Sequence, residues 1–249
     1  YVKWLGLGSS VLFFGLIALL WIASGAGLTG LDQYRCGARA VADQGPGPSF
    51  HVIRRFFDDG LAGLRGRADV FVPGVTRTVR MALAGGGTGG HLFPGLALAR
   101  HAATEGMVSS VLFFGAERGI EATLVPEHGF EVFAQPLTPV RGRGPADALV
   151  ALVRLAGAAW VVRGELKRRR IDVMVGLGGY ASVAGTMGAV MASVPLVLLE
   201  QNRRPGMANR LLAMASAAVC TSFEETADHF PLGRCRLTGN PVREELEDR

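Results

Sequence analysis

A histidine in a glycine-rich loop is the first feature of this chain that could do chemistry. Residues 85–91 read GGGTGGH, so His91 follows five glycines that only Thr88 interrupts. Glycine lets the backbone pass close to a ligand with its amide N–H groups free, which favours an anion such as a phosphate. An imidazole beside such a loop can accept a proton near neutral pH. The loop predicts a phosphate site next to a general base, with a helix-capping histidine as the structural alternative.

The same glycines also fit a dinucleotide-binding turn, because Gly85, Gly87 and Gly90 satisfy the G-x-G-x-x-G spacing. That interpretation needs an acidic residue about 20 positions later, at the end of the second strand, to bind a ribose. The nearest candidate, Glu117, comes late. A dinucleotide-binding oxidoreductase is therefore the weaker interpretation.

Three later motifs carry further polar groups. GLGGY at 176–180 is a second glycine loop and ends in Tyr180, EQNRRPG at 200–206 supplies Glu200, and GNPVR at 239–243 supplies a cation. Each alone has a structural alternative: a tight turn, a helix N-cap and a surface charge. Their joint occurrence favours one functional site.

Alternating strand-like and helix-like segments surround these motifs. The first helix is predicted to open after Pro94 and to stop at Gly106. Strands are predicted at 79–84, 110–115, 130–137, 171–180, 195–202, 217–223 and 235–242, with helices at about 120–128 and 145–170. This alternation predicts an α/β fold, a Rossmann-like parallel sheet with helices on both faces. Ligands bind such sheets where strands end in loops, and all four motifs fall there.

Composition limits the partners. The net charge of +5 comes from 26 basic and 21 acidic residues, which favours anionic lipid or phosphate over nucleic acid, since no basic run is interleaved with aromatic residues. The three cysteines are scattered, which excludes a disulfide framework or a zinc site of usual spacing. The sequence contains no Asp-x-Asp motif, so we expect neither a metal held by protein carboxylates nor a cofactor.

The N-terminal part has a different character. Residues 1–31 hold an uncharged run long enough to cross a membrane, and arginines follow it, which predicts a transmembrane segment with the rest of the chain in the cytoplasm. A signal peptide is the alternative. Residues 32–78 contain GPGPS and read as a linker. Because the chain starts at Tyr1 while Met81 precedes the glycine loop, we expect residues 1–80 to derive from another gene product.

The segment 79–245 resembles the MurG family of bacterial glycosyltransferases, on the strength of GGTGGHLFPGLALA and EQNRRPGMANRLLA. These enzymes transfer N-acetylglucosamine (GlcNAc) from UDP-GlcNAc to undecaprenyl-diphosphate-linked N-acetylmuramoyl-pentapeptide, which converts lipid I to lipid II in peptidoglycan synthesis. The resemblance implies the acceptor-binding N-terminal half of a GT-B fold at the cytoplasmic face of the bacterial inner membrane. It also implies that the donor-binding domain is absent from this chain.

The resemblance also implies residue roles. His91 corresponds to the residue proposed as general base, and Glu200 to an acid that lines the cleft. We expect both to be catalytic, with Glu200 the next candidate for the base if His91 is not. The family commonly has a histidine where this chain has Leu199, which predicts weaker polar support around Glu200. The implied UDP-GlcNAc contacts are Thr88, Gly89, Gly90, Asn202 and Arg243. The implied acceptor diphosphate contacts are Gly86, Gly87, Gly178, Gly179 and Tyr180.

Three interpretations of the activity stay open. The first is an inverting transferase of which this chain supplies the acceptor half, with little turnover by itself. The second is an anchored acceptor subunit that needs a separate donor subunit, as in the eukaryotic enzyme that extends dolichol-linked GlcNAc. The third is a non-catalytic remnant that binds lipid diphosphate.

We also expect a second membrane contact on the long helix after RGRG. Val150, Val153 and Trp160, with Arg154 and Arg163 nearby, could form an apolar patch with a basic rim. The alternative is that the same side chains pack against the sheet.

Overall fold

The computed structural model describes residues 78–137, 145–230 and 235–241. The predicted transmembrane segment at 1–31, all of the predicted linker but its last residue, and Arg243 lie outside the described residues. Within the described ranges, no helix is both long and apolar enough to cross a membrane.

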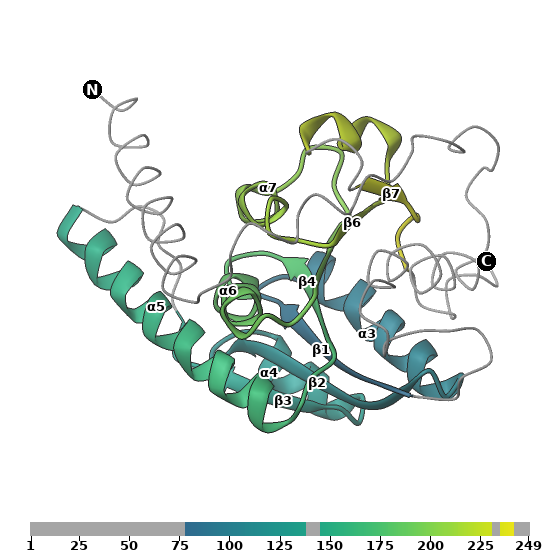
Figure 1. Ribbon diagram of the computed structural model, residues 1–249, viewed down its shortest axis with the longest axis horizontal. Coiled ribbons are helices and arrows are strands. Elements are labelled where there is room, and N and C mark those ends of the chain that lie inside the picture. Colours follow the sequence, from purple (N-terminus) through teal and green to yellow (C-terminus); the bar gives the residue numbers. More distant parts are fainter. Residues whose placement is uncertain (1–77, 138–144, 231–234, 242–249) are drawn as a thin grey trace.

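One parallel sheet organises the described part of the chain, in the order β3-β2-β1-β4-β5-β6-β7 (Figure 1). The order runs outward in both directions from the β1 and β4 pair, which is the arrangement of a Rossmann-type sheet and places the usual ligand crevice at the carboxyl ends of these two strands. The strands are β1 (Val79–Gly85), β2 (Val108–Ala116), β3 (Glu131–Gln135), β4 (Val173–Gly178), β5 (Leu196–Glu200), β6 (Ala218–Thr221) and β7 (Cys235–Leu237).

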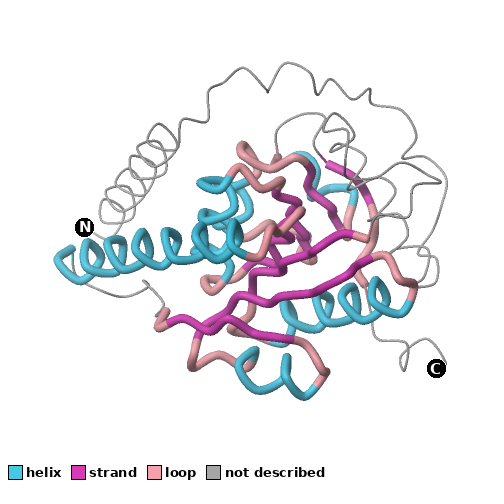
Figure 2. The backbone as a smooth tube through the Cα atoms, turned by 60° about the horizontal axis from the view of Figure 1, so that its bottom comes forward, coloured by secondary structure: helices cyan, strands magenta, loops and turns pink. Residues whose placement is uncertain are grey.

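Helices cover both faces of the sheet, as Figure 2 shows. One face packs against α3 (Gly89–Thr104) and α4 (Glu121–Glu127). The other packs against α5 (Pro145–Arg168), α6 (Ser182–Ala192) and α7 (Met207–Leu212). A 3₁₀ helix, η4 (Glu224–His229), follows β6. The predicted α/β fold with a parallel sheet between two helical layers is confirmed.

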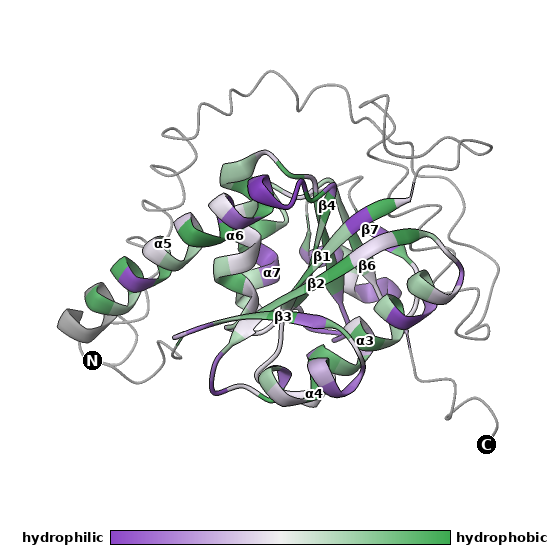
Figure 3. Cartoon of the chain, turned by 90° about the horizontal axis from the view of Figure 1, so that it is seen from below, coloured by the Kyte–Doolittle hydropathy of each residue, from purple (hydrophilic) through white to green (hydrophobic). Residues whose placement is uncertain are grey.

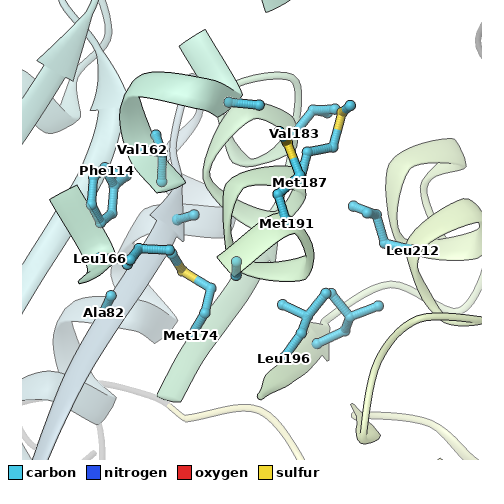
Figure 4. Packing of buried hydrophobic residues seen from close by; sticks show 14 of the residues in the cluster. Ala82, Phe114, Val162, Leu166, Met174, Val183, Met187, Met191, Leu196 and Leu212 are labelled. Carbon is cyan, nitrogen blue, oxygen red and sulfur yellow. The ribbon is translucent and has the colours of Figure 1, made fainter. Parts of the chain in front are cut away.

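The core consists of two apolar clusters because successive side chains of each strand point to opposite faces of the sheet. In β1, Met81 and Leu83 contact the α3 side, whereas Ala82 and Ala84 contact the α5 and α6 side. Figure 4 shows the second cluster, in which Met174 of β4 lies beside Leu166 of α5, while Met187 and Met191 of α6 lie on the side of Leu212. Burial on both faces explains why the central strands are continuous apolar runs rather than alternating ones.

Helices α5 and α6 approach each other closely at a glycine. A Cβ atom on Gly188 of α6 would lie 2.7 Å from the Val162 side chain and 2.9 Å from the Ala159 carbonyl oxygen of α5. This position therefore requires a residue without a side chain. Gly157, also on α5, faces open space.

The first helix differs from its prediction. It begins at Gly89, five residues before Pro94, after Thr88 in an extended conformation with φ −143° and ψ 152°. Pro94 therefore lies inside the helix, where it has no N–H to donate to the carbonyl of Gly90. The rule that proline marks a first turn misplaced this boundary, and the correction puts His91 on the helix rather than on the loop.

Ion pairs gather at the amino edge of the sheet. Asp172, just before β4, accepts hydrogen bonds from the backbone and the guanidinium of Arg80 in β1. Beyond the end of α5, Arg169 joins Glu165 of that helix to Glu131 of β3. These pairs connect the chain segments that enter β1, β3 and β4.

Candidate functional site

The two glycine loops begin side by side at the carboxyl edge of the sheet. Gly85, the last residue of β1, is paired with Gly178, the last residue of β4. Parallel strands end at the same edge, so the loops after β1, β4, β5 and β7 all lie there. The expectation that all four motifs fall at strand ends is confirmed as far as Pro241.

The glycine loops contact each other through their backbones. A Cβ atom on Gly179 would lie 2.8 Å from the carbonyl oxygen of Gly86, and one on Gly87 would lie 2.8 Å from the ring of Tyr180. Gly86, Gly87 and Gly179 have φ values of 141°, 79° and 78°, which side chains rarely adopt. Sterics and backbone conformation together therefore require glycine at these positions.

His91 lies at the junction of the two loops. Its Nδ1 is 2.9 Å from the hydroxyl of Thr88, and a Cβ atom on Gly178 would lie 3.3 Å from its Nε2. Burial lowers the pKa of His91 below its ordinary value, and the nearby Glu200 carboxylate opposes this shift only in part. Burial therefore favours the neutral form of the imidazole. If Nδ1 donates its hydrogen to Thr88, Nε2 keeps a free lone pair for a proton.

Glu200 is buried and fully engaged. One carboxylate oxygen accepts from the backbone and side-chain amides of Asn202, both at 3.0 Å. The other accepts from the Gly206 amide at 3.1 Å and from Asn209 Nδ2 at 3.0 Å. Four donors use the acceptor capacity of a carboxylate. Leu199 was predicted to weaken the polar support around Glu200. This prediction is wrong, because Asn209 of α7 donates a hydrogen bond to the Glu200 carboxylate.

Several amide oxygens near this edge still have acceptor capacity. The side-chain oxygens of Gln201, Asn209 and Asn240 are buried and accept no hydrogen bond within the described residues. The amide of Asn209 cannot simply be reversed, since its Nδ2 already donates to Glu200 and to the Leu199 carbonyl. Such oxygens can accept from hydroxyl or N–H groups of a polar ligand.

Sequence reasoning missed Glu121, the first residue of α4. Its side chain is fully buried, and its carboxylate accepts from the amide of Gly87 at 2.9 Å and from that of Ala116 at 2.8 Å. Glu117, the acid required by the dinucleotide interpretation, is exposed. A signal was present in the sequence, since Gly115 and Gly119 flank the strand end that Glu121 contacts.

The structure brings most of the predicted site residues together. The loop contacts join Gly86, Gly87, Thr88, His91, Gly178, Gly179 and Tyr180. Glu200 is close enough for its charge to act on the His91 imidazole, and it accepts hydrogen bonds from Asn202. Among the residues described, no three His, Cys, Asp or Glu side chains group as metal ligands.

The family profile and the curated relatives place the chain in one family. The sequence profile of the glycosyltransferase family 28 N-terminal domain matches residues 81–221. A UDP-N-acetylglucosamine--N-acetylmuramyl-(pentapeptide) pyrophosphoryl-undecaprenol N-acetylglucosamine transferase from Magnetococcus marinus is 42% identical over 167 residues, which are 67% of this chain and 45% of that protein. The protein of the same name from Trichlorobacter lovleyi is 39% identical over 174 residues, covering 68% and 44%.

A solved structure shows the same arrangement. The crystal structure of Acinetobacter baumannii MurG superposes with a TM-score of 0.56 at 25% identity, over 68% of this chain and 47% of that one. The chain thus spans a little under half the length of the relatives that it matches.

Proposed function

The chain belongs to glycosyltransferase family 28, whose N-terminal domain it contains, and from this premise we propose that it is the acceptor-binding half of an inverting UDP-GlcNAc transferase. The acceptor is undecaprenyl-diphosphate-linked N-acetylmuramoyl-pentapeptide, and the product is lipid II. Support for the substrates comes from the names of relatives about 40% identical to this chain. The rest of a GT-B fold, which would bind most of UDP-GlcNAc, corresponds to the part of those relatives that this chain does not match.

The observation that carries the proposal is the position of the His91 imidazole, which lies at the junction of two glycine loops. In an inverting transfer, the muramoyl hydroxyl oxygen forms a bond to the anomeric carbon of GlcNAc while the bond from that carbon to UDP breaks. The hydroxyl proton passes to Nε2 of His91, and UDP leaves with the bonding electron pair. A base that is neutral before the reaction and sits beside a diphosphate site suits this step.

Two groups of residues bind the substrates in this proposal. The acceptor diphosphate lies against the paired glycine loops, at Gly86, Gly87, Gly178, Gly179 and Tyr180. The donor contacts Thr88, Gly89, Gly90, Asn202 and Arg243. The amides of Gly89 and Gly90 support this assignment, because they open α3 and have no acceptor in the described part of the chain. Glu200 acts by holding Asn202 in place.

The outer side of α5 supports docking at the cytoplasmic face of the bacterial inner membrane. Val150, Val153, Trp160 and Val161 are 50%, 65%, 59% and 51% exposed. Arg163 lies 4.8 Å from the ring centroid of Trp160. These side chains therefore do not pack against the sheet, and Figure 3 shows apolar stretches along the projecting α5. An apolar strip with arginines suits an anionic membrane surface. The segment 1–31 would add an anchor.

A chimaeric enzyme tests the function. Residues 79–241 replace the matching N-terminal half of the Magnetococcus marinus relative, and lipid II formation is measured from lipid I and UDP-GlcNAc. We expect turnover within about tenfold of the parent enzyme, because the transition state needs groups from both halves. The 249-residue chain alone should turn over little unless a donor domain is added. A chimaera that binds lipid I but never transfers GlcNAc would favour the binding-only interpretation.

A further inference from the structure

The carboxylate of Glu121 lacks a cationic partner within the described residues. Its side chain is fully buried, and the ion pairs there involve other carboxylates. Its two oxygens instead take one backbone amide each, Oε2 from Gly87 and Oε1 from Ala116. A buried carboxylate is costly unless donors surround it. The two amides therefore supply the hydrogen bonds that make burial of this carboxylate possible.

Three glycines make the space that the carboxylate fills. A Cβ atom on Gly86, Gly115 or Gly119 would overlap the side chain of Glu121. These glycines come from the loop after β1, from β2, and from the turn before α4. Three chain segments thus omit a side chain around one carboxylate, which packing alone would not require.

We propose that Glu121 is a positioning residue, whose carboxylate occupies the Gly87 amide of the first glycine loop and so holds Thr88 and His91 at the junction with Gly178. Gly87 is adjacent to Thr88, whose hydroxyl in turn contacts His91 Nδ1. The hydrogen bond from the Gly87 amide to Glu121 therefore fixes the residue next to Thr88, and Thr88 in turn contacts the imidazole.

A consequence concerns the substrate, and this part rests on the proposed function. Because the Gly87 amide already donates to Glu121, the acceptor diphosphate cannot use that donor. Gly86 and Gly87 then shape the site, while the diphosphate must take its hydrogen bonds from other groups.

The first test removes the carboxylate and supplies another from solution. We expect Glu121→Ala to lower the Tm of the 249-residue chain by about 5 °C or more, because the buried Ala116 amide and the half-buried Gly87 amide lose their acceptor. Sodium formate should restore the Tm saturably, since formate binds only the folded state through those amides. Formamide and sodium chloride should not restore the Tm of the variant, and formate should not change the Tm of the native protein. Glu117→Ala, an exposed neighbour, is the matched control. Equal responses to formate and formamide would contradict the proposal.

The second test also covers the case in which the alanine variant does not fold. Glu121→Gln keeps the volume but replaces one acceptor oxygen with a donor. We expect amide exchange at Gly87 or Ala116 to become about tenfold faster or more, as local opening becomes easier. We also expect the ring nitrogen shifts of His91, read by NMR, to show a changed tautomer population. Unchanged His91 shifts despite faster exchange would reduce Glu121 to a packing role, and fast Gly87 exchange in native protein would overturn the proposal. Neither test needs transferase activity, so this proposal and the proposed function can fail separately.

Discussion

Three neighbours determine the position and the pKa of the His91 imidazole. Thr88 contacts one ring nitrogen, the paired glycine loops partly bury the ring, and the negative charge of Glu200 raises the pKa by less than burial lowers it. Burial lowers the pKa of His91, which favours the neutral ring with a lone pair for the substrate. We therefore place the proton transfer of the proposed reaction on this residue.

Replacing His91 tests that assignment. In the chimaeric enzyme, His91→Gln should lower kcat by about a hundredfold or more, the usual contribution of a general base, while substrate binding changes much less. In the parent chimaera, the acidic limb of kcat/KM should fall below the ordinary histidine pKa. The sign follows from burial, which disfavours the protonated ring. Nearly full turnover in the glutamine variant, with the acidic limb unmoved, would place the base elsewhere.

Glu200 makes a different prediction because its oxygens accept from four donors. Glu200→Gln turns one oxygen into a donor that faces two donors, so we expect a loss of roughly 1–3 kcal/mol in the free energy of unfolding. Glu225→Gln, which breaks only the exposed pair with Arg203, should cost at most about 0.5 kcal/mol. Urea titrations measure both. A Glu200→Gln variant with native stability but no turnover would instead indicate a direct catalytic role.

At the scale of elements, the contact between α5 and α6 depends on Gly188. Gly188→Ala would press a methyl group into Val162 and the Ala159 carbonyl, so we expect a loss of about 1–3 kcal/mol in unfolding free energy. Gly157→Ala on α5 faces open space and should instead stabilise by about 0.5–1 kcal/mol, since alanine favours a helix. Thermal or urea unfolding of both variants gives the comparison. A tolerated Gly188→Ala would mean that α5 and α6 can separate enough to admit a methyl group.

The exposed strip on α5 makes a prediction about membranes. A version without residues 1–77 should sediment with phosphatidylglycerol vesicles at low salt and less so at high salt. Trp160→Ser should weaken this binding about tenfold, because it removes a large apolar surface from the strip. Met214→Ser, which removes an exposed apolar side chain after α7, is the control and should bind normally. Protein that stays in the supernatant at low salt would contradict the docking proposal.

At the scale of the whole molecule, the two edges of the sheet have different roles: the carboxyl edge carries the candidate site, and the amino edge contributes to stability. The carboxyl edge holds the glycine loops, and the amino edge holds ion pairs such as that of Arg80 with Asp172. Asp172→Asn should therefore cost about 1–3 kcal/mol of unfolding free energy, since it removes charged hydrogen bonds. Turnover of the chimaera below its melting range should not change. A lower kcat at full folding would show that the edges are coupled.

Apolar runs and motif positions were enough to predict the strands, the parallel sheet with helices on both faces, and the edge where the site lies. Contacts between distant segments were not predictable in the same way. Glu121 reads as an ordinary residue at the start of a helix, and only the folded chain brings it to Gly87. Asn209 likewise reaches Glu200 from another element. The start of α3 was missed because a loop of glycines resembles a turn until its backbone is seen to be helical.

The pairing of Gly85 with Gly178 has a consequence for how the protein is made. A ribosome adds about 5–20 residues per second, so several seconds pass between synthesis of the first glycine loop and synthesis of the second. During that interval β1 can pair with β2, but its other side remains an open edge that invites association with other chains. Arrival of β4 closes that edge and completes the ligand site in the same step. A ligand that touches both loops can therefore bind only nascent chains that have passed this stage.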